Sequence, residues 1–174
     1  MPHWKNLRYL HAEEVIKKLE LKPNPTVDVL AITKTLGIPV FWNKTMQAQG
    51  RLWQDTERGL AEIHVAQGAP RDRFRFTVAH ELAHLLLHDF DEPLHEDFHD
   101  QPQTVKEREA NSFAARLLIP TGQLLWFKQL AGGPFKQEHI KELALLFRVS
   151  ENTMFYRVNN LEWIDPSLKI VPSQ

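Results

Sequence analysis

The spacing of hydrophobic positions along the chain separates segments that predict helix from segments that predict strand. In the first helical segment Ala12, Val15 and Leu19 fall on one face, as in an amphipathic helix packed on a core. The same spacing predicts helices over residues 11–22, 28–36, 104–120, 121–130, 137–147 and 151–161, besides an apolar helix around residues 78–88. Thr104 and Ser150 suit the N-caps of two of these helices.

Three shorter apolar segments predict strands. Residues 38–42 form one, and residues 50–53 and 60–65 form a hairpin joined by the polar turn 55–59. We therefore expect an α+β fold with a small antiparallel three-stranded sheet packed on helices. The acidic segment 89–100, which contains Pro93, is expected to be a solvated loop.

The length of 174 residues, with 43% hydrophobic and 25% charged residues, suits a single domain over residues 1–174. Within it we expect a core over residues 11–130 and a helical lobe over residues 135–164 that resembles a helix-turn-helix. The net charge is −1, and the second helix of that lobe offers only Arg157 as a cation. Because duplex binding depends on neutralising phosphates, we expect no direct nucleic acid binding.

The chain has no cysteine, no long apolar run and no apolar core of a signal peptide near its first residue. Thiolate metal sites are therefore excluded. We expect no membrane span, and the cytoplasm is the simplest compartment.

The segment His80-Glu81-Leu82-Ala83-His84 carries the clearest chemistry. On a helix, the two histidines lie about 40° apart around the axis and roughly 6 Å apart along it, so both rings can bind one Zn²⁺ ion. Glu81 is too close to His80 in sequence to be a third ligand, and it suits the general base that activates water. At this composition the motif arises by chance in about 4% of chains. The pattern therefore indicates a zinc-dependent hydrolase, most simply a peptidase.

The third ligand is open on pattern alone. Glu107 lies on the apolar face of the helix from residue 104, whose small residues would allow close approach, whereas Glu109 lies off that face. Glu107 could also be a surface carboxylate in a charged first turn. His88, about 12 Å along the axis from His80, is too far to share one ion and suits a hydrogen bond to a ligand or a helix C-terminus. His95 and His99 could form a second, adventitious site.

Two further features of a peptidase site remain open. The donor that stabilises the developing oxyanion could be Tyr9, Tyr156, His88 or Arg157, and the sequence does not rank them. We expect the hairpin to supply the free edge to which an extended substrate peptide adds. His64 could then touch substrate, although an exposed strand histidine is the default reading.

Two longer motifs resemble the ImmA/IrrE family of metallo-endopeptidases. They are RFTVAHELAHLLLH at residues 75–88 and EREANSFAARLLIP at residues 107–120, and the resemblance extends over about residues 12–164. It implies a zincin-like fold of the gluzincin type. It also implies zinc on His80, His84 and Glu107, with Glu81 as the catalytic acid and base.

The resemblance further implies a partner. Short members of this family are usually encoded beside a helix-turn-helix (Xre-type) repressor or antitoxin. Their characterised activity is cleavage of such a protein, which switches on a mobile element or a stress response. Two other functions remain open: a small-peptide zinc peptidase, and a non-catalytic module whose zinc has a fourth protein ligand such as His88. The oligomeric state is open as well.

Overall fold

The computed structural model describes residues 3–22, 25–89, 93–97 and 104–168. The elements along the described chain are η1 (Trp4–Leu7), α1 (Ala12–Lys18), α2 (Val29–Thr35), β1 (Val40–Asn43), β2 (Gly50–Asp55), β3 (Leu60–Ala66), α3 (Arg71–Leu87), β4 (Leu94–Asp97), α4 (Val105–Leu118), α5 (Thr121–Ala131), α6 (Gln137–Phe147) and α7 (Glu151–Asn159). The helices expected from the hydrophobic pattern are all present, most of them ending within a few residues of the expected bounds. The expected N-caps are present too: Thr104 accepts a hydrogen bond from the backbone of α4, and Ser150 from that of α7.

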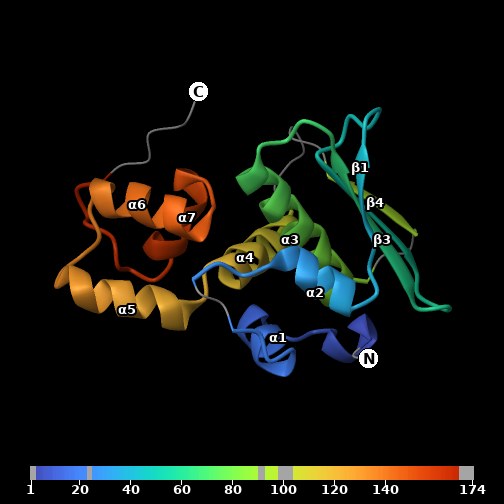
Figure 1. Ribbon diagram of the computed structural model, residues 1–174, viewed down its shortest axis with the longest axis horizontal. Coiled ribbons are helices and arrows are strands. Elements are labelled where there is room, and N and C mark those ends of the chain that lie inside the picture. Colours follow the sequence, from blue (N-terminus) through green and yellow to red (C-terminus); the bar gives the residue numbers. More distant parts are fainter. Residues whose placement is uncertain (1–2, 23–24, 90–92, 98–103, 169–174) are drawn as a thin grey trace.

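The elements form layers along the long axis of the molecule (Figure 1). The sheet lies at one end, α3 and α4 lie in the middle, and α5, α6 and α7 gather at the other end. Helix α3 packs on the inner face of β2 and β3 on one side and on α4 on the other, while α2 and η1 also contact it. The centre of the molecule is therefore a helix covered from several directions.

The sequence of α3 explains this central position. Its residues from Thr77 to Leu86 are all buried, which leaves no polar face for solvent. A helix that is apolar all round has to lie inside a protein rather than on its surface. Polar groups placed on such a helix are costly unless a partner satisfies them, so His80, Glu81 and His84 need one.

The sheet has four strands in the order β1-β3-β2-β4, and β1 runs parallel to β3 while the other pairs are antiparallel. The prediction of a three-stranded antiparallel sheet is therefore wrong in strand number and in direction. The expected hairpin of β2 and β3 is present, with Ile63 and Val65 buried toward α3. Both of its strands are interior, however, and β1 and β4 form the two edges of the described sheet.

Strand β4 lies inside the segment that was expected to be a solvated loop. It pairs with β2 in a register that sets Glu96 opposite Arg51, and the Arg51 Nε donates to Glu96 Oε1 at 2.8 Å. Opposite charges facing each other across a strand pair stabilise the pairing. The acidic composition of the segment therefore does not oppose a strand, because β2 supplies the matching cation.

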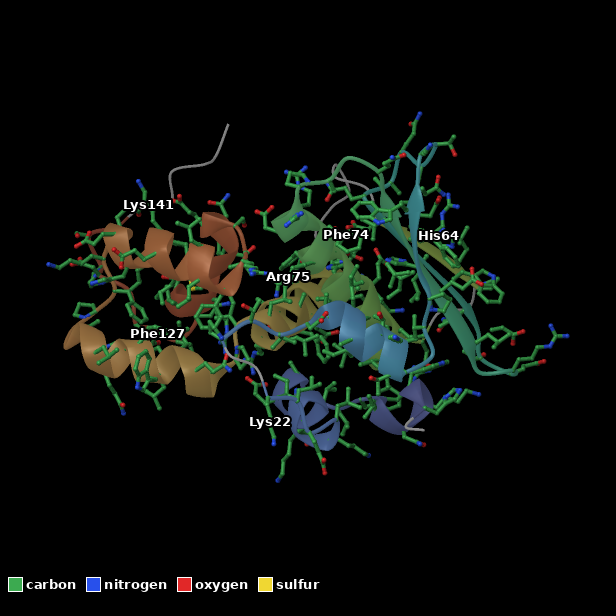
Figure 2. The ribbon with its side chains drawn as sticks, viewed as in Figure 1. Lys22, His64, Phe74, Arg75, Phe127 and Lys141 are labelled. Atoms are coloured by element: carbon green, nitrogen blue, oxygen red, sulfur yellow. The ribbon has the colours of Figure 1, made fainter. Side chains whose placement is uncertain are left out.

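Two arginines, partly buried Arg75 and buried Arg157, hold the C-terminal helices against the rest of the chain. Arg75 of α3 donates to the backbone oxygens of Phe147, at 2.9 Å, and of Arg148 at the end of α6, and to the oxygen of Val27, also at 2.9 Å. It lies between α3 and the pair α6 and α7 (Figure 2). Arg157 of α7 donates to the oxygen of Ile119 at 3.1 Å, just after α4. No helix among the described residues has the length and apolarity needed to cross a bilayer.

Candidate metal centre

Two histidines of α3 meet at one point. The Nε2 atoms of His80 and His84 are 2.9 Å apart, and both side chains are almost fully buried. The spacing of four residues puts them on one face of the helix, one turn apart. That face is turned toward α4, which contributes the third side chain.

Helix α4 brings Glu107 to the two histidines. Its first turn is fixed by Thr104, whose Oγ1 accepts from the Glu107 backbone N–H. Ala110 and Ala114 are completely buried, and their small side chains allow α4 to lie close to α3. Glu107 Oε2 lies 3.2 Å from His80 Nε2, and its Oε1 lies 3.3 Å from His84 Nε2.

The hydrogen bond at His80 Nδ1 determines whether the Nε2 atom that faces His84 and Glu107 carries a proton. His80 Nδ1 lies 3.0 Å from the side-chain oxygen of Asn111, which is one turn after Glu107 on α4. An amide oxygen only accepts, so Nδ1 carries the proton and the Nε2 of a neutral His80 has a free lone pair. Burial lowers the pKa of His84 to about 4. The imidazole rings of His80, His84 and His95 beside Glu107 hold the pKa of its carboxyl group well below its ordinary range, so Glu107 is a carboxylate.

Glu81 lies beside this cluster without a hydrogen bond. Its side chain is completely buried, and neither carboxylate oxygen has a hydrogen-bond partner among the described residues. Burial, followed by repulsion from Asp97 and Glu107, raises the pKa of Glu81 well above its ordinary value. A buried carboxyl group without a partner is destabilising. A group that binds beside it would remove that cost.

Strand β4 adds two side chains that sequence analysis did not assign to this site. His95 Nε2 lies 3.6 Å from Glu107 Oε1, and Asp97 Oδ2 lies 3.9 Å from His80 Nε2. Both belong to the same face of the strand because they are two residues apart. The only sequence signal for them is this alternation, and it becomes visible once residues 94–97 are known to be a strand.

The remaining candidates lie elsewhere. His88 contacts the far side of the His84 ring through Nδ1 at 3.0 Å, and its Nε2 lies 3.0 Å from Glu109 Oε2. Neither His88 nor Glu109 belongs to a possible metal-holding group among the described residues. His99 lies outside the described residues, so the adventitious site with His95 has no structural account.

The other oxyanion candidates have different partners, and so does His64. Tyr9 is exposed and donates to Asp89, and Tyr156 is exposed on α7. Arg157 is occupied by the oxygens that follow α4. His64 alternates with the buried residues of β3, so it lies on the sheet face turned away from α3, beside Glu62 and Phe41.

The donor set fits a divalent cation. One atom from each of His80, His84 and Glu107 lies within 4.8 Å of the others. Two imidazole lone pairs and a carboxylate repel one another in a buried site, and a cation at their centre relieves that repulsion. A second group, His80 with Glu81 and Asp97, also converges. It shares His80 with the first group and lies on the side facing β4.

No curated protein matches the sequence. The Peptidase_M78 family model, described as the IrrE N-terminal-like domain, matches residues 33–159. The matched range includes the sheet, both helices of the His80, His84 and Glu107 cluster, and α5 to α7. The resemblance to the ImmA/IrrE family is thereby confirmed, and the chain belongs to this family of metallo-endopeptidases.

Proposed function

We propose that this metallo-endopeptidase uses zinc held by His80, His84 and Glu107, and that Glu81 is its general base. The observation that carries the proposal is the convergence of three donor atoms within 4.8 Å beside a buried Glu81 that has no hydrogen bond to any described residue. Two imidazoles and one carboxylate form the ligand set of many catalytic zinc sites, and three protein ligands leave a position for water or substrate.

The chemistry divides between the metal and the chain. Bound zinc acts as a Lewis acid that polarises the scissile carbonyl and makes water more acidic. Glu81 accepts a proton from the attacking water and then delivers it to the nitrogen of the leaving amine. The apolar surroundings that raise the pKa of Glu81 also make its carboxylate a stronger base than one in water.

His95 is our choice for the donor that stabilises the oxyanion, in place of the four residues considered from the sequence. Its ring centroid lies 4.3 Å from that of His84, and its Nε2 lies 3.6 Å from Glu107 Oε1, so the ring is placed directly beside the cluster. Of the earlier four, His88 lies behind His84, and the other three are engaged or exposed elsewhere.

The substrate edge that we propose is β4, in place of the β2–β3 hairpin. An extended peptide adds to a sheet only at an edge, and both hairpin strands are interior. Strand β4 is an edge of the described sheet and carries His95 and Asp97 beside the cluster. A peptide aligned along β4 would pass the donor atoms, whereas one added at β1 would be separated from β4 by three strands, β1, β3 and β2.

We further propose that the substrate is a helix-turn-helix regulator encoded nearby, and that α6 and α7, the helix-turn-helix-like lobe, help to dock it. Family membership supports the first point, since the characterised activity of the resembled family is cleavage of such a regulator. A requirement for an extended segment at β4 supports cleavage in a linker rather than inside a folded domain.

The test uses the purified chain with its zinc content measured, the neighbouring regulator as substrate, a chelator, and the variant Glu81→Gln. Glu57→Gln in the turn between β2 and β3 is the matched control, because Glu57 is exposed and lies outside both the cluster and the proposed docking lobe. We expect cleavage at one site that the chelator stops and that the control retains. Glu81→Gln should keep one zinc per chain and lose at least about 100-fold in rate.

Other outcomes would change the proposal. Native-rate cleavage by Glu81→Gln would refute the assignment of the base. Rapid turnover of unrelated short peptides without cleavage of the regulator would favour a small-peptide peptidase. Tight binding of the regulator with one zinc and no cleavage would favour a non-catalytic module.

A further inference from the structure

A chain of hydrogen bonds leads from the candidate metal centre to the C-terminal end of α3 and on to α4. It runs from His84 Nδ1 to His88 Nδ1 at 3.0 Å and from His88 Nε2 to Glu109 Oε2 at 3.0 Å. His88 follows the last residue of α3, and Glu109 lies on α4, two residues after Glu107. The chain therefore joins the same two helices as the metal centre, but behind it.

Proton positions along this chain follow from the acceptor at its end. A carboxylate only accepts, so His88 Nε2 carries a proton. In neutral His88 the other nitrogen, Nδ1, is then an acceptor, and the proton between the two Nδ1 atoms belongs to His84. That assignment leaves the Nε2 of neutral His84 with a lone pair, and Nε2 is the atom that faces His80 and Glu107.

The opposite direction of proton donation between His88 and His84 shows what Glu109 contributes. Without an acceptor at Nε2, neutral His88 can carry its proton on Nδ1 and donate it to His84. The Nδ1 of His84 would then be the acceptor, and its proton would move to Nε2, where it blocks binding of a cation. Glu109 thus selects the His84 tautomer that can act as a ligand, although it lies outside the ligand group.

The position of His88 is fixed by backbone contacts as well as by its ring. The side chain is 5% exposed. Its backbone N–H donates to the oxygen of His84, and its backbone oxygen accepts from Arg8 Nη2 at 2.9 Å. These bonds hold the residue where α3 ends, so that its ring stays against His84. Glu109 is 56% exposed, which makes it the safer position to vary.

We propose that His88 and Glu109 are positioning residues, which act through His84 by holding its tautomer and ring orientation for the metal. The proposal rests on the proposed zinc site. Hydrogen bonds to metal-ligating histidines typically change metal affinity by about 10- to 100-fold. Glu109, the alternative ligand considered from the sequence, therefore has a different role from Glu107.

The test compares Glu109→Ala and Glu109→Gln with Glu138→Ala, an exposed glutamate on another helix, as the control. The dissociation constant of Zn²⁺ is measured by competition with a chromophoric chelator. Glu109→Ala should weaken binding by about tenfold or more. Glu109→Gln keeps an acceptor oxygen and should stay within about threefold of the unmodified chain, as should the control.

Two readouts separate positioning from a general loss of structure. Long-range ¹H–¹⁵N spectra report which ring nitrogen of His84 carries a proton. In the unmodified chain this should be Nδ1, and in Glu109→Ala the fraction of His84 with its proton on Nδ1 should fall. His88→Asn places an oxygen near the original Nδ1 and should retain more zinc affinity than His88→Ala. Thermal unfolding of the metal-free proteins shows whether each variant is folded.

Unchanged zinc affinity in folded Glu109→Ala, or a proton on His84 Nε2 in the unmodified metal-free chain, would overturn the proposal. If the unmodified chain bound no zinc, the proposed zinc site itself would fail, which is a different result. Weaker zinc binding by both Glu109→Ala and Glu109→Gln would assign the effect to charge rather than to the hydrogen bond, and that outcome would also overturn it.

Discussion

Gly50 at the start of β2 should be essential because the Glu81 carboxyl group lies against its α-carbon. A Cβ at this position would lie 2.0 Å from Glu81 Oε1 and 2.8 Å from Thr77 Cγ2. Gly50 is paired with Val65 on one side and with Asp97 on the other, so its backbone cannot retreat. In Gly50→Ala, Glu81 therefore has to move.

The size of the movement sets the expected effect. Ordinary contact begins at 3.4 Å, so the carboxylate oxygen must move by 3.4 − 2.0, or about 1.4 Å. A misplacement of about 1 Å in a reacting group typically costs about 100-fold in rate. Because Glu81 is completely buried, the same crowding should lower the free energy of unfolding by about 1–3 kcal/mol. The three heavy atoms nearest to the added Cβ belong to Glu81 and Thr77 and not to the proposed ligands, so we expect zinc content to stay at one per chain.

The assay measures kcat/KM on the proposed regulator substrate, zinc content and denaturant unfolding for Gly50→Ala. Gly122→Ala is the control, because nothing lies within 4 Å of a Cβ added at Gly122 in α5. That substitution should leave the rate unchanged and stabilise by up to about 1 kcal/mol. Unaltered activity and stability in Gly50→Ala would refute the argument.

A double-mutant cycle makes the test specific to the pair. In the Glu81→Ala background the clashing carboxyl group is absent, so most of the stability cost of Gly50→Ala should disappear. A coupling free energy of about 1 kcal/mol or more is expected for groups in such direct contact. Additive costs would show that Gly50 acts through something other than Glu81.

Two further predictions concern pH and the attachment of the C-terminal helices. Burial lowers the pKa of His84 from 6.5 to about 4, so the unfolded state binds a proton first as the pH falls. The metal-free protein should therefore lose up to roughly 3 kcal/mol of unfolding free energy between about pH 6.5 and 4. The unfolding free energy is measured against pH in the Glu81→Gln background, with and without His84→Asn, because Glu81→Gln removes the opposite pH dependence of Glu81. Equal slopes of unfolding free energy against pH in the two proteins would contradict the pKa shift of His84. Arg75→Ala removes three hydrogen bonds, two to the end of α6 and one to Val27, and should cost about 2 kcal/mol or more in denaturant unfolding. Lys141→Ala, at an exposed position, should stay within about 0.5 kcal/mol.

Local sequence was sufficient to predict the helices because their signals are contained in single segments. The N-cap residues Thr104 and Ser150 and the apolar faces lie within a few residues of the helices that they specify. The spacing in α3 predicts that His80 and His84 meet, which the structure shows. Choosing Glu107 over Glu109 required more, because the packing of α4 on α3 decides which carboxylate reaches the histidines.

Strand pairing could not be predicted in the same way. The pairing of β4 depends on Arg51 opposite Glu96, which are 45 residues apart in the sequence. The acidic composition predicted a loop there. Because the strand was not predicted, His95 and Asp97 were not assigned to the candidate metal centre. The wrong choice of the hairpin as the substrate edge has the same origin, since a strand is an edge only with respect to all of its neighbours.

The state of Glu81 favours catalysis over a purely structural metal site. A structural site gains stability from saturated ligands, and every buried group around it can be hydrogen-bonded. Here the fold buries a carboxyl group completely, leaves both of its oxygens without a hydrogen bond among the described residues, and keeps a glycine behind it to make room. Replacing Glu81 by an apolar residue would relieve that cost in the metal-free protein. An arrangement that lowers stability and places a basic carboxylate beside three side chains that could hold a metal is useful for moving a proton, and it has no purpose in holding the fold together.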